Sequence, residues 1–565
     1  MKKLLAVTLA LLCAPLYAAE AKQDVLLDTM QKELKRNFTV LKKQNPSVYY
    51  LSYFAQDSVD FEAAAAFGEI FYEKDVSARE LDVDARVGSP KLDNTHEFKG
   101  MYEDNISLST VYLPIENNPA AIKNGLWRKT EAEVKKAQDQ FLKVQTDAAI
   151  RAKNEDESND FSAPLKPVNY YNPVKAPDFD KEKMKAMLKE LSLIAKDADF
   201  LLNYDVRFRI STKNRYIVTS EGSSVVEGGT LIRLYYSFYT RNADGMETEV
   251  FNAYDGFSLS DIPAQKVIAK DMAKDLENAK KIVNAPAMEP FSGPVILKGK
   301  AAGVFFHEIL GHRVEGHRQK SEAFAQTFTK QVGKEVVSPI LSVYDDPTLS
   351  HYNGTPLRGF YEYDDDGVKS QRVTIIKDGT LKNFLMGRSP INNFPQSNGH
   401  GRKEIGNRTV SRMGNTIAEV KNPVTYQELK KMLKEEIKKQ GKPYGLIVDD
   451  VQGGLTPVGR SSAQSFKVEP TLIYRVFPDD RPDEVVRGLN IVGTPLASFA
   501  KIAAGADDVE IFNGNCGAES GWVPVSAISP SILITELEME KVEKSVLKLP
   551  ILPPPSADNS AKGGK

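Results

Sequence analysis

"HEILGHRVEGHR", residues 307–318, holds three of the six histidines of the chain and a glutamate beside the first of them. Zinc-binding helices usually space two histidines by four residues, so that both lie on one face. At ~100° per residue, the spacing of five between His307 and His312 places them ~140° apart around a regular helix. The helix must therefore end or bulge between them. We expect this at Gly311, because glycine ends helices in a left-handed conformation or tolerates a wide turn.

The residues before the motif predict a short buried helix. The segment "GKAAGVFFHEILGH" (299–312) follows an expected strand in "PFSGPVILKG". Its apolar residues Ala301, Val304, Phe305, Ile309 and Leu310 would bury one side of that helix. The first histidine then lies near the end of the helix, and the second lies where the backbone turns.

Two histidines beside a glutamate suggest a zinc site that lacks a third ligand. Zinc prefers nitrogen and sulfur ligands, and a catalytic site keeps one position for water. The candidate is Cys516 in "FNGNCGAESGW", since the only other cysteine, Cys13, lies near the start of the chain. Glu308 would not bind the metal but could take a proton from water and pass it to a leaving amine.

Alternatives stay open for each of these residues. His307 can be a hydrogen-bonded core histidine, and Cys516 can be a small buried hydrophobic residue. His317 is a possible extra ligand, which would close the tetrahedron and leave no place for water.

Composition and the first residues indicate an exported protein. The 565 residues carry a formal net charge of -2, with 41% hydrophobic and 27% charged residues, and no basic excess suggests nucleic-acid binding. Residues 1–21 combine Lys2 and Lys3, an apolar run and small residues, which predicts a signal peptide cleaved between Ala18 and Ala21. The apolar run is too short for a stable membrane anchor. We expect a periplasmic or secreted protein.

The hydrophobic pattern predicts an α+β fold. Residues 22–290 would form an N-terminal domain of helices on an antiparallel sheet, with helices at 24–45 and 261–283, a strand at 80–88 and further strands from 205. Residues of about 115–200 read as a helical insertion, with helices at 119–153 and 180–198 and a Pro-rich linker at 163–179. Residues 291–548 would form a mostly β C-terminal domain that carries the HExxxH helix, and 549–565 would be a disordered tail.

Residues 290–540 resemble the TldD/PmbA family of zinc metalloproteases, and specifically its motif-bearing, TldD-type members. The resemblance rests on "HEILGHRVEGHR", "LSVYDDPT" (341–348), "NGHGRKEIGNRTVSRMGNT" (398–416), "GLIVDDVQGG" (445–454) and Cys516-Gly517, in the family's order. Two features depart from the family: His317 stands where an acidic residue is common, and "CGAESGW" is longer than the usual turn after the cysteine.

The resemblance implies one Zn²⁺ per chain on His307, His312 and Cys516, with Glu308 as the catalytic base. It also implies unfolded or extended peptides as substrates. The partner would be a second copy, giving a homodimer, or a motif-lacking family member, giving a heterodimer, with active sites that face an enclosed space.

Two further stretches are candidates for substrate binding. Asn407, Arg408 and Arg412 can line a cleft and orient a peptide, although a solvated basic loop is the more ordinary interpretation. Gly453 and Gly454 can let an extended peptide pair with their strand, or can simply form a tight turn.

The function that these residues favour is an exported zinc-dependent peptidase. One rival is a non-catalytic exported binding or assembly protein with a structural zinc, closed by His317. Another is a zinc amidase that acts on a different peptide-like substrate, such as cell-wall peptide. Glu308 argues against the structural site, which has no use for a base.

Overall fold

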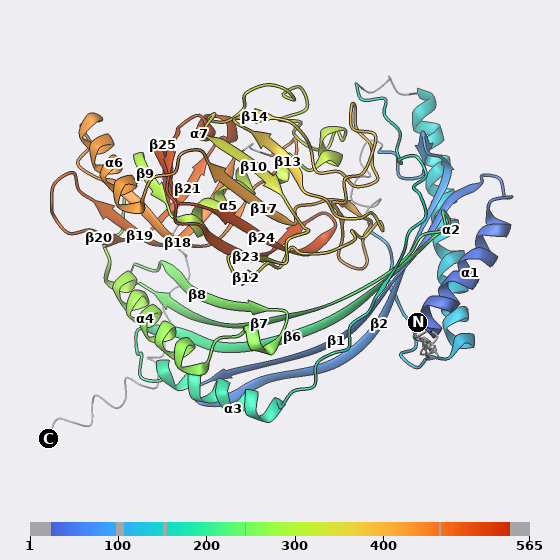
Figure 1. Ribbon diagram of the computed structural model, residues 1–565, viewed down its shortest axis with the longest axis horizontal. Helices are drawn as coiled ribbons and strands as arrows, with labels where there is room; N and C mark the ends of the chain where they lie inside the picture. The colour runs from blue at the N-terminus through green and yellow to red at the C-terminus, as the bar shows by residue number, and fades with distance from the viewer. Residues whose placement is uncertain (1–23, 98–106, 151–154, 243, 463–464, 543–565) are drawn as a thin grey trace, which may run out of the picture.

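A curved sheet from the first half of the chain wraps around a lobe from the second half (Figure 1). The structure is a computed structural model that describes residues 24–97, 107–150, 155–242, 244–462 and 465–542. The expected signal peptide and the expected tail lie outside these residues. The α+β class is confirmed, with a mostly β second half that carries the motif helix.

Four long antiparallel strands form the centre of the curved sheet, in the order β2-β1-β6-β7. They are β1 (Val48–Ala66), β2 (Glu69–Ser89), β6 (Leu201–Thr219) and β7 (Ser224–Arg241). At ~3.3 Å per residue, the 19 residues of β1 extend over ~60 Å. Phe67 and Gly68 both have positive φ, which gives the two-residue turn between β1 and β2 the twist that antiparallel strands prefer.

Shorter strands extend this sheet on both sides. They are β3 (Leu92–Asp93), β4 (Val111–Tyr112), β5 (Asn169–Asn172) and β8 (Glu247–Gly256). The strand expected at 80–88 is the second half of β2.

Helices cover the curved sheet at its two ends (Figure 1). The sheet helices are α1 (Val25–Leu41), α2 (Pro119–Ile150), α3 (Lys181–Ser192) and α4 (Gln265–Asn284), and short 3-10 helices follow at Leu193–Ala195 and Leu259–Asp261. α1 begins where the side chain of Asp24 accepts the N–H of Leu27. Apolar residues of α1 and α2 share one cluster with the strands, and those of α3 and α4 share another.

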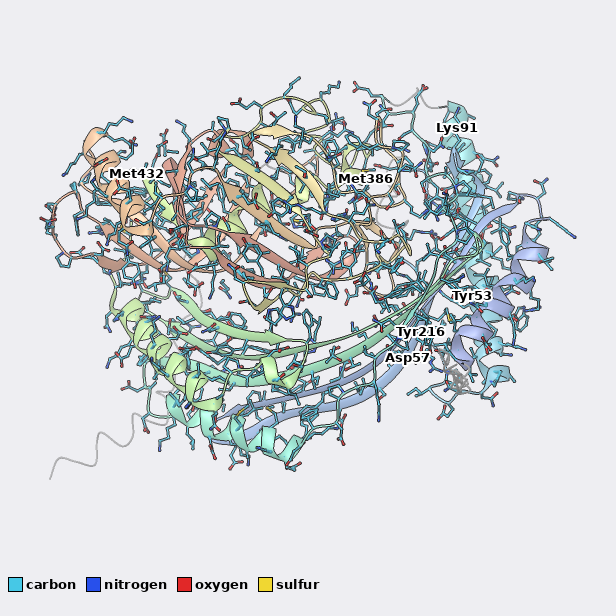
Figure 2. The ribbon with its side chains drawn as sticks, viewed as in Figure 1. Tyr53, Asp57, Lys91, Tyr216, Met386 and Met432 are labelled. Carbon is cyan, nitrogen blue, oxygen red and sulfur yellow. The ribbon has the colours of Figure 1, made fainter. Side chains whose placement is uncertain are left out.

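Tyr53 of the sheet forms hydrogen bonds with helices α1 and α2. The hydroxyl of Tyr53 on β1 accepts a hydrogen bond from Asn37 of α1 at 2.8 Å and lies 2.8 Å from the hydroxyl of Thr130 on α2. Tyr53 is completely buried, so both bonds form away from water. Figure 2 shows this residue near the end of the sheet that α1 and α2 cover.

The segment of about 115–200 is more than a helical addition. It carries α2 and α3 as expected, but the Pro-rich stretch between them, expected to be a linker, contributes β5. β5 pairs in parallel with residues 224–227 of β7, so this stretch is part of the sheet. Proline favours extended backbone, and a strand at a sheet edge tolerates it.

Two sheets enclose the motif helix in the second half. The six-stranded sheet contains β10 (Leu341–Asp345), β13 (Val373–Lys377), β14 (Thr380–Leu381), β17 (Asn415–Val420), β23 (Glu510–Ala518) and β24 (Gly521–Ser529). The seven-stranded sheet contains β9 (Phe291–Leu297), β18 (Gly445–Leu455), β19 (Phe466–Val476), β20 (Glu484–Val486), β21 (Leu489–Gly493), β22 (Ile502–Gly505) and β25 (Ile532–Lys541). Two ribbons complete the strands, β11 (His351–Tyr352) with β12 (Thr355–Pro356) and β15 (Gly401–Arg402) with β16 (Val410–Ser411).

The motif helix α5 (Gly299–Ile309) contacts both sheets. Gly303 lies against the carbonyl of Ala527 on β24, so close that a side chain there would collide with it. Phe305 contacts Phe466 of β19, with ring centres 5.5 Å apart. The remaining helices of this half are α6 (Tyr426–Lys439), α7 (Pro495–Phe499) and the 3-10 helices Gly311–Arg313 and Gly316–Gln319.

Ion pairs join the two halves. They connect strands and one turn of the curved sheet with loops of the lobe, and their carboxylates are largely buried: Arg215–Asp365, Arg358–Asp255, Arg388–Glu221 and Lys403–Asp82. Removing one partner of such a pair leaves a buried charge and is strongly destabilising, so these contacts fix the lobe against the sheet.

Among the described residues, no helix is both long enough and apolar enough to cross a membrane.

Candidate metal centre

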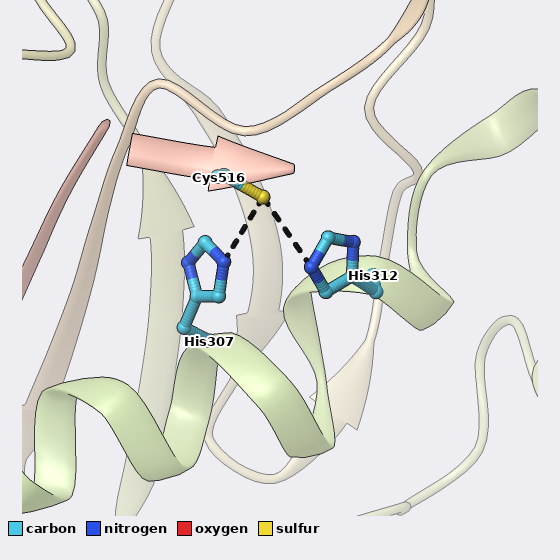
Figure 3. Close-up of side chains that lie close together, drawn as sticks. All are labelled: His307, His312 and Cys516. Carbon is cyan, nitrogen blue, oxygen red and sulfur yellow. Dashed lines mark hydrogen bonds between the residues drawn. The ribbon is translucent and has the colours of Figure 1, made fainter. Parts of the chain in front are cut away.

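The helix that carries His307 ends before His312, as the spacing predicts. α5 ends at Ile309, and His312 lies in the 3-10 helix Gly311–Arg313. The tighter turn rotates the backbone, so that both imidazoles face the same point (Figure 3).

The reason for Gly311 differs from the one expected. Its φ does not lie in the left-handed region, unlike that of several other glycines among the described residues. A side chain at this position would instead collide with the sulfur of Met413, which packs against the turn. Gly311 is therefore needed for the close packing of Met413 against the turn that carries His312, and not for an unusual backbone conformation.

His307, His312 and Cys516 come together in a buried group (Figure 3). The Nε2 atom of His307 lies 3.2 Å from Sγ of Cys516, and Nε2 of His312 lies 3.3 Å from the same sulfur. The ligand atoms of all three lie within 4.8 Å of one another. Cys516 reaches this point from β23, 204 residues beyond His312 in the sequence.

The group fits a zinc ion. Zinc–nitrogen bonds of ~2.0 Å and zinc–sulfur bonds of ~2.3 Å in a tetrahedron place nitrogen and sulfur ~3.5 Å apart, close to the separations seen here. Two imidazoles and one thiolate are a donor set that zinc uses, and three protein ligands leave a fourth position for water. The residues therefore can hold a metal ion in the manner of a catalytic site.

The charges of the group favour the deprotonated form of Cys516. Burial by itself raises the pKa of the Cys516 thiol, but the positive His312 and His307 lower it by more, to well below its usual value. Burial lowers the pKa values of both histidines, and the negative sulfur more than reverses this effect. The lowered pKa favours the thiolate, which is the form of cysteine that binds metals.

Glu315 orients His312 from behind. Its carboxylate lies 3.3 Å from Nδ1 of His312 and accepts a hydrogen bond of 2.8 Å from Arg318. Burial raises the pKa of Glu315, but His312 and Arg318 together outweigh burial and bring it to about 2. A carboxylate on the outer nitrogen of a ligand histidine fixes the tautomer and ring orientation. Sequence reasoning missed this role, although the spacing of three from His312 is the signal that could have found it.

Arg412 supports the same group from below. Its side chain is fully buried and donates hydrogen bonds to the carbonyl of Cys516 at 2.6 Å and to the hydroxyl of Ser520 at 2.9 Å. Its Nε also lies 3.5 Å from Glu315. Arg412, expected to line a cleft, instead holds the backbone of one candidate ligand and the carboxylate behind another.

Arg408 and Asn407, the other two predicted residues of this loop, lie at the contact between the two halves. Arg408 forms an ion pair with Asp84 of β2, and the backbone N–H of Asn407 donates to the carbonyl of Glu404. Burial lowers the pKa of Arg408 to about 10. The side chain of Asn407 lies next to Gly521, in the turn that follows Cys516. Asn407 and Arg412 thus both lie at Gly521, whereas Arg408 pairs with the curved sheet.

His317 is not part of the His–His–Cys group among the described residues. Its Nε2 bonds the carboxylate of Glu519, which also accepts a hydrogen bond of 2.7 Å from Arg318. The positive Arg318 and His317 overcome the effect of burial and hold the pKa of Glu519 well below its usual value. His317, the possible fourth ligand, therefore bonds the carboxylate of Glu519 instead.

Glu308 lies beside the group and against a strand. Burial raises its pKa above the usual value for a glutamate. A Cβ atom on Gly454 of β18 would lie 2.5 Å from Cγ of Glu308, so the strand can approach only because this residue is glycine. Gly453 next to it faces open space. The "VQGG" stretch is thus a strand rather than a tight turn, and it passes directly over the candidate base.

Comparison with known proteins agrees with this geometry. A family model described as the PmbA/TldA metallopeptidase C-terminal domain matches residues 291–541. A metalloprotease of Methanocaldococcus jannaschii is 30% identical over 234 residues, which are 41% of this chain and 47% of that protein. A zinc metalloprotease TldD homolog of Saccharolobus solfataricus is 23% identical over 484 residues, which are 85% of this chain and 97% of that protein. The chain spans about half the length of the first curated relatives that it matches.

The fold is also shared with a solved structure. TldE from Thermococcus kodakarensis superimposes with a TM-score of 0.58 and 15% identity, over 90% of this chain and 100% of that one. The matched domain contains the whole His–His–Cys group, and the relatives are named metalloproteases. Residues 291–541 therefore belong to the family of the PmbA/TldA metallopeptidase C-terminal domain, and the chain has the fold of TldE.

Proposed function

We propose that this protein is a zinc-dependent peptidase that hydrolyses unfolded or extended peptides. The observation that carries the proposal is the buried His307, His312 and Cys516 group with the Glu308 carboxylate beside it. His307, His312 and Cys516 would hold one Zn²⁺ per chain. A bound zinc ion would supply Lewis acidity, which polarises a carbonyl and lowers the pKa of water.

Glu308 would carry out the two proton transfers of the reaction. The Glu308 carboxylate accepts a proton from the attacking water as the water oxygen bonds to the peptide carbonyl carbon. It then donates that proton to the leaving amine nitrogen as the C–N bond breaks. Its raised pKa suits the first step, because a carboxylate of higher pKa takes a proton from water more readily.

The strand edge at Gly453 and Gly454 supports an extended substrate. β9 pairs only with residues 446–448 of β18, and among the described residues the later part of β18 pairs with β19 alone. Its other edge can therefore form backbone hydrogen bonds with a peptide. Leu455 at the end of this edge has 64% of its surface exposed, and it offers an apolar contact for a substrate side chain.

Replacing Glu308 tests the catalytic part of the proposal. Glu308→Gln keeps the shape of the side chain but cannot accept the proton, so we expect retained zinc and a loss of kcat of at least ~100-fold on a peptide library. Glu289→Gln, with a side chain that is 80% exposed, is the matched control and should behave as wild type. Equal activity of Glu308→Gln and wild type would contradict the role of the base. Absence of cleavage by zinc-loaded wild-type protein would favour the non-catalytic binding protein.

Export and assembly are further parts of the proposal. Residues 1–21 would direct the protein to the periplasm or out of the cell, and the mature chain isolated from native cells should begin between Ala19 and Lys22. A chain that begins at Met1 would contradict export. We propose a dimer with a second copy or with a motif-lacking family member. Sedimentation of the mature protein at the mass of a monomer, both alone and with that partner, would contradict the dimer.

A further inference from the structure

Three strand edges meet at a cavity of about 310 Å³ that lies outside the metal centre. β8 is the last strand of the curved sheet, and β23 is the last strand of the six-stranded sheet. The third edge belongs to β18, where among the described residues only β19 pairs with it. An open strand edge presents unpaired N–H and C=O groups, so the walls of this cavity suit an extended chain.

Two oppositely charged side chains reach this cavity without pairing. Lys300 and Asp450 both line it, together with the aromatic residues Phe251, Tyr254 and Phe512. The carboxylate of Asp450 accepts one hydrogen bond, from the N–H of Val451 at 2.9 Å. Within the described part of the chain, Lys300 and Asp450 are not close enough to form an ion pair, although they lie on the same cavity.

Negative charge prevails in the cavity. Asp255 and Asp261 line it as well, but each is already engaged. Asp255 pairs with Arg233 and Arg358, and Asp261 accepts backbone N–H groups. Asp450 has less compensation, since it accepts one backbone N–H and forms no ion pair among the described residues: burial raises its pKa, and the attraction of Lys300 does not reverse this effect. A positive group of a ligand would supply the missing partner.

Two strands lead from the cavity to the candidate metal centre. β18 runs from Asp450, in the cavity wall, to Gly454, which touches Glu308. β23 runs from Asn513, also in the wall, to Cys516. At ~3.3 Å per residue these strands cover ~10–13 Å, the length of three or four residues of an extended peptide.

We propose that this cavity is a specificity subsite, in which Asp450 binds a positively charged group of the peptide three or four residues from the cleaved bond. The positive group is either the α-ammonium group at the start of the peptide or the side chain of a lysine or arginine. Lys300 opposes binding of a second cation and so restricts the subsite to one positive charge. The aromatic residues cover the apolar part of the bound side chain. This inference rests on the proposed peptidase function.

The test uses the full-length mature protein loaded with zinc and a series of ten-residue peptides. In each peptide a single lysine or its neutral isostere norleucine occupies successive positions, and the amino terminus is either free or acetylated. We expect one position, three or four residues from the cleaved bond, at which the positive group raises kcat/KM roughly 10-fold or more, as for a hydrogen bond to a charged partner. Loss of the preference on acetylation identifies the α-ammonium group, and loss with norleucine identifies the side chain.

Asp450→Asn keeps the size of the side chain and removes its charge, so the ratio of kcat/KM for the lysine and norleucine peptides should fall toward one. Asp449→Asn removes the same charge one residue away, where the side chain pairs with Lys298 at 2.9 Å, and should retain the preference. A preference that survives Asp450→Asn, or no preference in wild type at any position, would overturn the subsite.

A binding measurement separates the subsite from the peptidase function. Glu308→Gln protein keeps the cavity, so the dissociation constants of fluorescently labelled lysine and norleucine peptides can be compared without cleavage. A preference for the lysine peptide that is lost in Glu308→Gln/Asp450→Asn supports the subsite even if wild type cleaves nothing. Equal binding of both peptides contradicts the subsite even if wild type is an active peptidase.

Discussion

The curved sheet and the lobe differ in how far apart along the chain their contacting segments lie. In the sheet, each long strand pairs with a strand of matching length, and β1 and β2 pair across a two-residue turn. In the lobe, the metal centre combines an 11-residue helix, a 3-10 turn and a strand that follows about 200 residues later. Regular local patterns therefore specify the sheet, whereas contacts between distant segments specify the centre.

The interiors of the two regions also differ in chemistry. Apolar clusters hold the helices of the curved sheet, and the buried charges among them, such as the pair Lys129–Glu133 of α2, do not bond a candidate ligand. Behind the candidate ligands, Glu315, Arg318 and Arg412 are buried and interact with one another. Substitutions in the lobe should therefore act first on metal binding, and those in the sheet on stability alone.

The largest effect is expected from the two histidines. His307→Ala with His312→Ala removes two of three candidate ligands, and we expect the purified protein to lose its one equivalent of zinc and all peptide cleavage. Elemental analysis after dialysis measures the metal content. Stoichiometric zinc in the doubly substituted protein would place the metal elsewhere in the molecule.

Cys516 should connect metal binding to thiol chemistry. With residues 1–21 removed it is the sole cysteine, and bound zinc should shield its thiolate from alkylating reagents. We expect slow labelling of the zinc-loaded protein and fast labelling after chelation, in parallel with zinc release and loss of activity. Cys516→Ser should weaken zinc binding and abolish cleavage while the protein stays folded.

Labelling that does not change on chelation would remove Cys516 from the metal site. A large fall in melting temperature on chelation would instead indicate a structural zinc, as the non-catalytic rival requires.

Much of the sheet could be predicted from the sequence because its signals are local. The strand at 80–88 alternates apolar and polar residues, and Met30, Leu34 and Leu41 recur on one face of α1. The β5 strand could not be found in this way, since its pairing with β7 is a tertiary contact made by a Pro-rich stretch.

The sequence predicts the candidate ligands of the site, but not the residues packed around them. Two histidines and the one cysteine beyond the expected signal peptide limit the choice of ligands, and the structure brings these three side chains together. Which side chains surround them depends on packing: Arg412 reads as a surface cation in the sequence but is fully buried. The close approach of Gly454 to Glu308 is likewise a meeting of segments about 146 residues apart, which no local pattern encodes.

A moderate effect is expected when the carboxylate behind His312 loses its charge. Glu315→Gln weakens the contact that orients the ring, and we expect the zinc dissociation constant to rise ~10–100-fold. Competition with a chromophoric chelator measures the constant, and circular dichroism verifies the fold. His317→Gln is the matched comparison, because His317 also follows α5 and pairs with a glutamate but lies outside the group. An equal loss of affinity in both variants would mean that the whole segment, rather than Glu315, positions His312.

The smallest effect is expected in the curved sheet, where it should spare the metal centre. Tyr53→Phe removes the hydroxyl that bonds Asn37 and Thr130, and leaves the buried amide of Asn37 without this partner. An unsatisfied buried donor costs about 1–3 kcal/mol, so the free energy of unfolding should fall by that amount in urea titrations. Tyr112→Phe, at a side chain with 77% exposure, should leave it unchanged. Zinc content and kcat/KM should match wild type in both variants, since Tyr53 acts on α1 and α2 and contacts no ligand. Loss of zinc from Tyr53→Phe would show that the two regions are energetically coupled, and the ion pairs between sheet and lobe, such as Arg358–Asp255 at 2.8 Å, would then be the contacts to dissect.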